Sequence, residues 1–321
     1  MANNKMDSKN RNISVSIVIL TYNRVNLLNS LLETLYRIKY SGLEIIVIDN
    51  CSTDDTELVI RERHTDILYL KTDSNIGVGA RNLGLQMAHG DIIICLDDDV
   101  FGIDDDAIQN ILDIFNRDSR IGAVNFKIVD FYNKQQCNWV HHCKKEQHGD
   151  GFFITYEITE GAVAFRKKAL NEAGLYPSYF FLSHEGPDLA FRIMDIGYQV
   201  VYCGHVIVEH CHSDLGRKSW YSYYYDTRNQ YWLSARNFPI RYMLKYLLVG
   251  QLSTLLYSLR DGYFRYWLKA VFDGMLGLPR ALADRKVVSQ DTINVIMAID
   301  QERPSIVYMM KERIFKKHMR L

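Results

Sequence analysis

The most constraining feature of this sequence is the stretch Asp91–Asp99, DIIICLDDD, in which an apolar run ends in three consecutive carboxylates. A short apolar run after a turn signal predicts a strand buried on both faces, with the carboxylates at its carboxyl end. Side chains two apart on a strand share a face, so we expect Asp97 and Asp99 to converge while Asp98 points away. Crowded carboxylates repel unless a cation lies among them, and oxygen ligands suit Mg²⁺ or Mn²⁺ bound together with phosphates.

A second acidic triplet, residues 104–106, provides an internal comparison. It precedes apolar residues at helical spacing, where acidic side chains favour the helix dipole and need no ligand. We assign it to helix capping, with Asp104 as the N-cap. The first triplet ends a buried strand, which capping explains less well, so metal–phosphate binding is the preferred interpretation there.

The first hundred residues alternate between strand-like and helix-like segments. The predicted strands are 14–20, 44–49, 67–70 and 91–97. This order predicts an α/β fold with a mainly parallel sheet and right-handed crossovers. Ligands of such sheets bind outside the carboxyl ends of the strands, where Tyr22, Asp49 and Asp97 fall.

Length and composition exclude several classes of protein. The 321 residues predict one large domain with an appendage, or two domains. Lysine plus arginine and aspartate plus glutamate both number 38, so the net charge of zero gives no indication of a nucleic-acid partner. Six cysteines without a CxxC pair suit a reducing compartment, which predicts a cytoplasmic protein. The polar residues 1–12 lack a signal peptide's apolar core and are predicted to form a disordered tail.

The segment Gly77-Val-Gly79 is a weak phosphate-loop signal. It lacks the full GxGxxG spacing directly after a strand, and no GxxxxGK[ST] occurs in the chain, so dinucleotide-binding and P-loop chemistry are rejected. Arg81 follows at the start of a predicted helix. It is either a cation that meets a nucleotide phosphate or base, or a solvated helix arginine.

Four linked motifs over about 90 residues, SIVILTYNR, VIDNCSTD, NIGVGARNLG and ICLDDDV, resemble the nucleotide-binding half of family 2 glycosyltransferases, inverting enzymes of the GT-A fold. The resemblance implies that Asp49 hydrogen-bonds the base, Asp97 lies near the ribose, and Asp99 binds the metal that bridges the donor diphosphate. The full nucleotide-binding set that we expect is Thr21, Tyr22, Asn23, Arg24, Asp49, Asn75, Gly77, Arg81, Asp97 and Asp98. The metal set is Asp99, Asp97 and His210.

The second half should contribute the acceptor side. We expect a strand over 121–129, an irregular acceptor-facing loop over 131–153, and a strand over 158–165 in which Gly161 permits a close approach. His141, His142, Cys143 and His148 fall in that loop. Their spacing matches no usual zinc finger, so zinc is the less favoured interpretation.

The stretch HEGPDLAFR predicts a helix start with two acids, Glu185 and Asp188, which either cap the helix or include a general base. The resembled family commonly has Glu-Asp-x-Asp here, with the base usually on the second acid. That position is Gly186 in this chain. We therefore expect Glu185 to be the base, with Asp188 as the alternative, and a free glutamate with a pKa near ~4.3 would need partial burial to serve.

Two short strands, 200–202 and 206–208, are predicted before His210. A lone histidine is usually a surface or core residue, but the family often has a metal-ligating histidine after this strand. Asp99, His210 and diphosphate oxygens would then share the cation.

The composition changes after Trp220. Residues 239–286 hold eight Lys/Arg against three Asp/Glu, and the longest uncharged run, of 14 residues, is too short to span a bilayer. Two interpretations stay open: a helical subdomain packed on the core, or basic amphipathic helices on an anionic membrane surface, placing the protein peripherally on the inner face of the cell membrane.

The predicted organisation is a catalytic domain over 13–218, divided into halves 13–100 and 101–218, and a helical extension over 219–321. The predicted function is a metal-dependent inverting hexosyl- or deoxyhexosyltransferase of polysaccharide biosynthesis. Its donor is a UDP- or dTDP-linked sugar, its cofactor Mn²⁺ or Mg²⁺, and its acceptor a glycan or lipid-linked hydroxyl. The alternatives are a non-catalytic sugar-nucleotide or glycan-binding protein and a sugar-phosphate nucleotidyltransferase. The oligomeric state, including a homo-oligomer, stays open.

Overall fold

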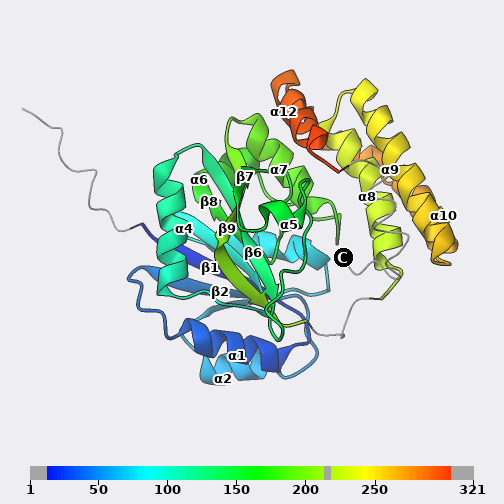
Figure 1. Ribbon diagram of the computed structural model, residues 1–321. Helices are drawn as coiled ribbons and strands as arrows, with labels where there is room; N and C mark the ends of the chain where they lie inside the picture. The colour runs from blue at the N-terminus through cyan, green and yellow to red at the C-terminus, as the bar shows by residue number, and fades with distance from the viewer. Residues whose placement is uncertain (1–12, 213–217, 305–321) are drawn as a thin grey trace, which may run out of the picture.

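The computed structural model describes residues 13–212 and 218–304. Within these ranges, nine strands form one sheet in the order β3-β2-β1-β4-β8-β6-β9-β5, with β7 paired to β9 (Figure 1). The predicted tail 1–12 and the residues from 305 onward lie outside the described part of the chain.

The first half of the chain builds the parallel part of the sheet. Strand β1 pairs in parallel with β2 and β4, and β2 pairs in parallel with β3, as the sequence predicted. The elements are β1 (Val15–Thr21), α1 (Val25–Leu35), β2 (Leu43–Asp49), α2 (Thr56–Arg63), β3 (Leu68–Lys71), a 3-10 turn η1 (Gly77–Ala80), α3 (Arg81–Met87) and β4 (Ile92–Asp97).

The second half makes the sheet mixed. Strand β8 lies between β4 and β6 and runs antiparallel to both, whereas β6 and β9 are parallel. The elements are β5 (Val100–Phe101), α4 (Asp105–Arg117), β6 (Ile121–Asp130), α5 (Lys145–His148), β7 (Phe152–Ile154), β8 (Ala162–Arg166), α6 (Lys167–Ala173), α7 (Glu185–Asp195) and β9 (Gln199–His210).

Two predicted strand boundaries were wrong. The strand expected over 158–165 starts only at Ala162, so the residues before it form a loop that reaches the end of β4. The two short strands expected before His210 are one strand, β9, with an irregular register opposite Phe126 and Lys127. An irregularity of this kind breaks the apolar alternation in the sequence without ending the pairing.

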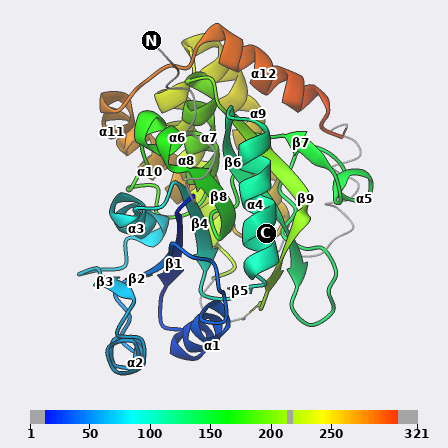
Figure 2. The ribbon, with the colours of Figure 1, turned by 90° about the vertical axis from the view of Figure 1, so that its left-hand side faces the viewer.

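Helices cover both faces of the sheet (Figure 2). Leucines of α1 and apolar residues of α4 pack on one face. Helices α3, α6 and α7 contribute to a second apolar cluster on the other face. Both faces of β1 and β4 are therefore buried, which explains their continuous apolar sequences.

A helical extension follows the sheet, as expected, and lies beside α7 (Figure 1). Its helices are α8 (Tyr221–Asn237), α9 (Ile240–Arg260), α10 (Phe264–Leu276), α11 (Leu278–Ala283) and α12 (Gln290–Gln301). Trp232 and Leu233 of α8 join the apolar cluster under α7. Among the described residues, no helix combines the length and apolar character needed to cross a membrane.

Candidate active site

The acidic triplet lies where β4 ends, and its three side chains do not alternate as we predicted. Strand β4 stops at Asp97, and the next two residues form a turn. Asp98 therefore lies beside Asp99, and Nη1 of Arg24 donates to Oδ1 of Asp98 at 3.0 Å and to Oδ2 of Asp99 at 2.5 Å. The Thr21 hydroxyl also donates to Asp98, at 2.7 Å. The prediction that Asp98 points away was wrong because strand alternation does not extend into a turn.

Asp97 has a different partner. It forms an ion pair with Arg81, which is buried and also donates to the Leu96 carbonyl oxygen at 2.9 Å. A Cβ atom on Gly161 would overlap the Asp97 carboxylate, so the glycine permits the close approach expected at that position. The interpretation of Arg81 as a solvated arginine was wrong, and a ligand would meet Asp97 before it met the arginine.

Asp99 also faces His210, the last residue of β9. The Nε2 atom of His210 lies 3.3 Å from Oδ1 of Asp99. Burial disfavours charge on both side chains, but their mutual attraction outweighs it. This attraction lowers the pKa of Asp99 and raises the pKa of His210 to about 9. The structure thus brings Arg24, Asp99 and His210 together from three separate segments.

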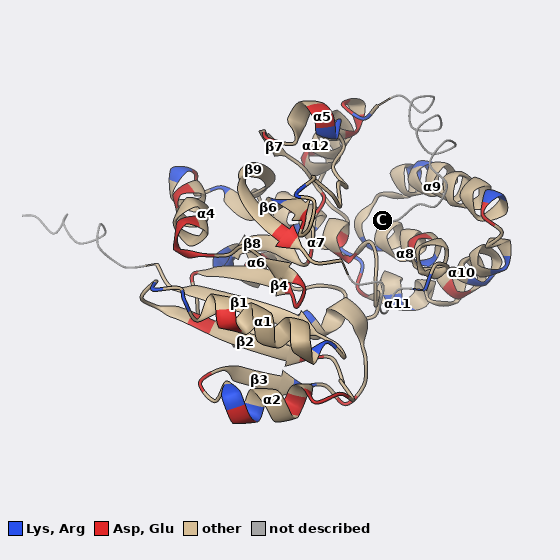
Figure 3. Ribbon diagram, turned by 60° about the horizontal axis from the view of Figure 1, so that its bottom comes forward, with Lys and Arg blue, Asp and Glu red and all other residues tan. Residues whose placement is uncertain are grey.

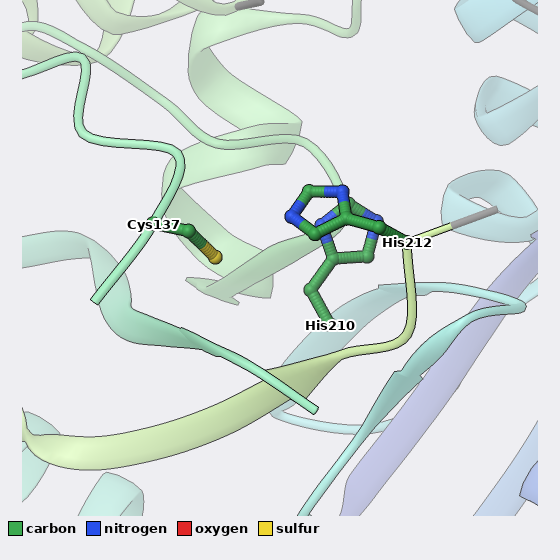
Figure 4. A group of neighbouring side chains, drawn as sticks. All are labelled: Cys137, His210 and His212. Carbon is green, nitrogen blue, oxygen red and sulfur yellow. The ribbon is translucent and has the colours of Figure 1, made fainter. Parts of the chain in front are cut away.

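Two residues that sequence reasoning missed lie next to His210. Ligand atoms of Cys137, His210 and His212 all lie within 4.8 Å of one another, and Figure 4 shows these three side chains grouped together. Asn138 lies 2.8 Å from the other ring nitrogen of His210. Cys137 escaped notice because no spacing links it to residues more than 70 positions away.

The histidines weighed for zinc do not form such a group within the described part of the chain. His141 is buried against Trp139, Phe153 and Tyr202. Burial lowers the pKa of His141 to about 3. It is therefore a neutral aromatic residue of the core.

The loop after β1 forms the edge expected to receive a nucleoside. The Tyr22 side chain is 44% exposed there. Asn23 adopts a left-handed backbone conformation, and its side chain accepts a hydrogen bond from the Thr53 amide at 2.7 Å.

Asp49, at the end of β2, is buried and accepts hydrogen bonds from the Ser52 amide at 2.7 Å and from the Tyr69 hydroxyl at 2.5 Å. Its carboxylate thus ties the loop after β2 to strand β3.

Asn75 and Gly77 belong to the turn that precedes α3. Asn75 accepts from the Gly77 amide at 3.0 Å and from Asn50 at 3.0 Å. Gly77 has a positive φ of 66°, and a Cβ atom there would overlap the Phe181 backbone. The glycine pattern therefore serves close packing of the 178–183 loop.

That loop precedes α7 and is strained. Phe181, Ser183 and His184 all have positive φ angles. Asn229 of α8 donates to the carbonyl oxygens of Leu182 and Ser183, both at 2.7 Å. Strained backbone persists where surrounding structure over-determines it. The helical extension thus fixes the entry to α7.

The two acids at the start of α7 have different surroundings. Asp188 is fully buried and accepts from Arg236 at 2.8 Å, Arg192 at 2.9 Å and Asn237 at 2.7 Å. These cations keep the pKa of Asp188 below its usual value despite burial. Glu185, one turn earlier, is 2% exposed and lies near Glu160, whose pKa is raised by burial and by the charge on Glu185. Sequence reasoning missed Glu160 because it placed residues 158–161 inside a strand.

Comparison with known proteins identifies a family for this chain. A family profile described as Glycosyl transferase family 2 matches residues 16–174, which hold β1 to α6 and the acidic triplet. An uncharacterized protein of Haemophilus influenzae is 30% identical over 184 residues, covering 54% of this chain and 97% of that protein. The chain belongs to glycosyltransferase family 2.

Two further similarities extend this assignment. The O-antigen chain rhamnosyltransferase WbaN of Salmonella anatum is 24% identical over 197 residues, covering 57% of this glycosyltransferase and 61% of WbaN. The mannosyltransferase PcManGT of Pyrobaculum calidifontis, solved with GDP-Man and Mn²⁺, matches with a TM-score of 0.56 at 19% identity. That match covers 95% of this chain and 89% of PcManGT and shows the same GT-A fold.

Replacing Asp188 should cost stability. Asp188→Ala leaves Arg192 and Arg236 partly buried without their shared anion, a loss of about 3–5 kcal/mol. Chemical denaturation measures this loss. The control is Glu172→Gln, which removes an exposed 3.9 Å pair with Lys168 and should change stability by less than about 0.5 kcal/mol. A loss below about 1 kcal/mol for Asp188→Ala would contradict the structural role.

Proposed function

We propose that this glycosyltransferase moves a sugar from a nucleoside-diphosphate donor to a hydroxyl group of a glycan or lipid-linked acceptor, in a metal-dependent reaction that inverts the anomeric carbon. The observation that carries this proposal is the contact between Asp99 and His210 at the carboxyl edge of the sheet, where Arg24 links Asp99 to the loop that contains the exposed Tyr22. Open α/β sheets bind ligands at this edge.

The donor set at this edge fits a divalent cation. The carboxylate oxygen of Asp99 is a ligand that both Mn²⁺ and Mg²⁺ accept, whereas the ring nitrogen of His210, with His212 and Cys137 nearby, favours a transition metal such as Mn²⁺. Asp97 is paired with Arg81, so we assign it to the donor ribose and not to the metal. Once bound, the cation would neutralise charge on the leaving diphosphate.

The nucleoside would lie against Tyr22, in the loop after β1 that Asn23 ties to the Thr53 amide, with Asp49 nearby at the end of β2. Asp49 already accepts two hydrogen bonds, and a carboxylate has lone pairs for a further donor from the base. Arg24 lies beside Asp98 and Asp99, where it would meet the diphosphate. PcManGT was solved with GDP-Man, so the UDP or dTDP donor predicted from the sequence needs direct comparison with a GDP donor.

Of the two candidate bases, Glu185 suits the role and Asp188 does not. Asp188 is held by two arginines that favour its charged form and weaken it as a base. Glu185 precedes the helix and would take the proton from the acceptor hydroxyl as its oxygen attacks the anomeric carbon. The bond to the diphosphate breaks on the opposite face, with an oxocarbenium-like transition state.

Asp99→Ala should lose donor binding and activity together, because both depend on the metal–diphosphate contact. Isothermal titration with a sugar nucleotide in Mn²⁺ measures the affinity, and we expect a loss of at least ~10-fold. Asp106→Ala, in the second acidic triplet, is the matched control and should bind like the wild type. Equal affinity in Asp99→Ala and wild type would refute the metal assignment.

Glu185→Gln should retain donor binding and lose turnover, because the amide keeps the size of the side chain but accepts no proton. We expect a rate loss of about 10²–10⁴-fold. Metal-dependent donor hydrolysis, with water as the acceptor, measures it before the natural acceptor is known. Unchanged hydrolysis would exclude Glu185 as the base.

The same hydrolysis assay separates the alternatives. A non-catalytic binding protein would bind the donor and never hydrolyse it. A nucleotidyltransferase would instead join a sugar phosphate to a nucleoside triphosphate. Such enzymes usually have a glycine-rich, basic loop after the first strand, and the loop after β1 here reads Tyr22-Asn23-Arg24.

The outer face of the extension supports peripheral contact with an anionic membrane. Exposed apolar side chains recur at helical spacing along α9 and α10; they are Ile240, Leu244, Leu248, Leu252, Leu256, Leu259, Phe264, Leu268, Phe272 and Leu276. Helix α9 carries no acidic residue, and much of its ribbon is uncharged (Figure 3). Lys245 and Arg265 are exposed beside the apolar stripe. This combination is typical of helices that lie in a membrane interface.

Vesicle sedimentation tests this contact. The protein should bind vesicles that contain phosphatidylglycerol more strongly than pure phosphatidylcholine vesicles, and Leu248→Gln with Leu252→Gln should reduce that binding. Leu58→Gln, at an exposed position of α2, is the control. A variant that binds vesicles normally but changes from a dimer to a monomer would instead make this face an interface between two copies.

A further inference from the structure

Gly186 stands where the resembled family commonly has its second acid, and its surroundings give a physical reason. A Cβ atom on residue 186 would overlap Oε1 of Glu160 and would lie 2.5 Å from the Ile158 carbonyl oxygen. The loop that leads into β8 therefore packs directly against the first turn of α7. Because backbone cannot easily move aside, a side chain at residue 186 is excluded, and a carboxylate from Glu160 occupies its space.

Glu160 extends toward Gly186 from the loop before β8, and contacts with β4 fix this loop. The next residue, Gly161, packs against the Asp97 carboxylate, and the Asp97 amide donates to the Gly161 carbonyl oxygen at 3.2 Å. The side of the loop that faces α7 thus carries Glu160, and the side that faces β4 contacts the expected ribose position. Unlike Glu185, Glu160 is partly exposed.

We propose that Glu160 and Glu185 together form the catalytic base, with the Glu160 carboxylate in the position that residue 186 leaves without a side chain. This inference rests on the proposed glycosyl transfer. The acceptor oxygen forms its bond to the anomeric carbon and gives its proton to the carboxylate pair. The electron pair of the broken bond leaves with the nucleoside diphosphate, and the pair releases its proton to water after the product departs.

Pairing Glu160 with Glu185 would give a base with a higher proton affinity than that of an isolated glutamate. A free glutamate has a pKa near ~4.3, whereas two neighbouring carboxylates repel until one of them takes up a proton. Burial and the charge on Glu185 raise the pKa of Glu160 well above its usual value. Two carboxylates that interact strongly take up their first proton as a pair, so that proton is assigned to neither residue alone.

The other charged and titratable groups around the pair come from several elements. Arg81 of α3 lowers the proton affinity of Glu160, and Asp97 of β4 raises it. Burial keeps Cys95 and Tyr176 in their neutral forms by raising the pKa of each. Burial also lowers the pKa of His184, next to Glu185, which favours its neutral form. The strongest charge acting on Glu160 is that of Glu185.

The test is the pH dependence of metal-dependent donor hydrolysis in Glu160→Gln. In the wild type the hydrolysis rate should decrease as the pH is lowered through the near-neutral range, because the pair then takes up its first proton. In Glu160→Gln the repulsion is gone, so this acid limb should move down by at least about one pH unit. The maximal rate should fall about 10–100-fold, because the remaining glutamate is a weaker base. Donor affinity should not change.

Glu157→Gln is the matched control. Glu157 lies on the same loop, but its partner is Arg303 at 3.2 Å. Its replacement should lower stability and leave the acid limb in place. An acid limb in Glu160→Gln that coincides with that of the wild type would overturn the proposal, because the limb would then belong to another group such as His184.

A second measurement separates failure of this inference from failure of the proposed function. Carbon-13 NMR follows the glutamate carboxyl groups in the protein without donor. A raised titration step should be present in the wild type and absent in both Glu160→Gln and Glu185→Gln. If that step is missing in the wild type, the pair does not exist, even if the enzyme transfers sugar. If the step is present and no donor is hydrolysed, the pair stands and the proposed reaction is wrong.

Discussion

The site depends on a match between buried carboxylates and cations at the carboxyl end of β4. Asp98 and Asp99 could not be buried there, next to the half-buried Asp97, without opposite charges. Arg81 faces Asp97, Arg24 faces Asp98 and Asp99, and His210 faces Asp99. These cations come from α3, the loop after β1, and the end of β9, so the match ties both halves of the sheet to one edge. A divalent cation and a diphosphate would bind at a site whose charged side chains are already held in position.

Glycines allow the surrounding segments to approach this edge. Gly77 packs against the Phe181 backbone, Gly161 against Asp97, and Gly186 against the loop that carries Glu160. The first two contacts join the donor half to the half expected to receive the acceptor, and the third joins two segments within that second half. The strained loop before α7 is held in turn by Asn229 of α8. The helical extension therefore supports the loop before α7 directly, in addition to exposing an apolar surface.

The sequence predicted the donor half well because its signals are local. Apolar runs, turn residues and helical spacing located β1 to β4, and the strand ends located the carboxylates. What it missed depended on contacts between distant segments. Antiparallel insertion of β8 has no signature within that strand, and Cys137 joins His210 only through the pairing of β6 and β9. Glu160 was assigned to a strand, because apolar residues on either side of it hide a loop. Arg81 was judged by its position on a helix, which does not reveal its burial against Asp97.

The most direct test of the central claim is a calorimetric comparison of UDP-, dTDP- and GDP-linked sugars binding to the wild-type protein, with and without Mn²⁺. A ligand that binds only the folded state will also raise the melting temperature of the protein. The account predicts that one nucleotide binds and that its affinity depends on the cation. Equal affinity with and without the cation would contradict the assignment of Asp99 and His210. Absence of binding by any of the three would contradict the proposed donor site.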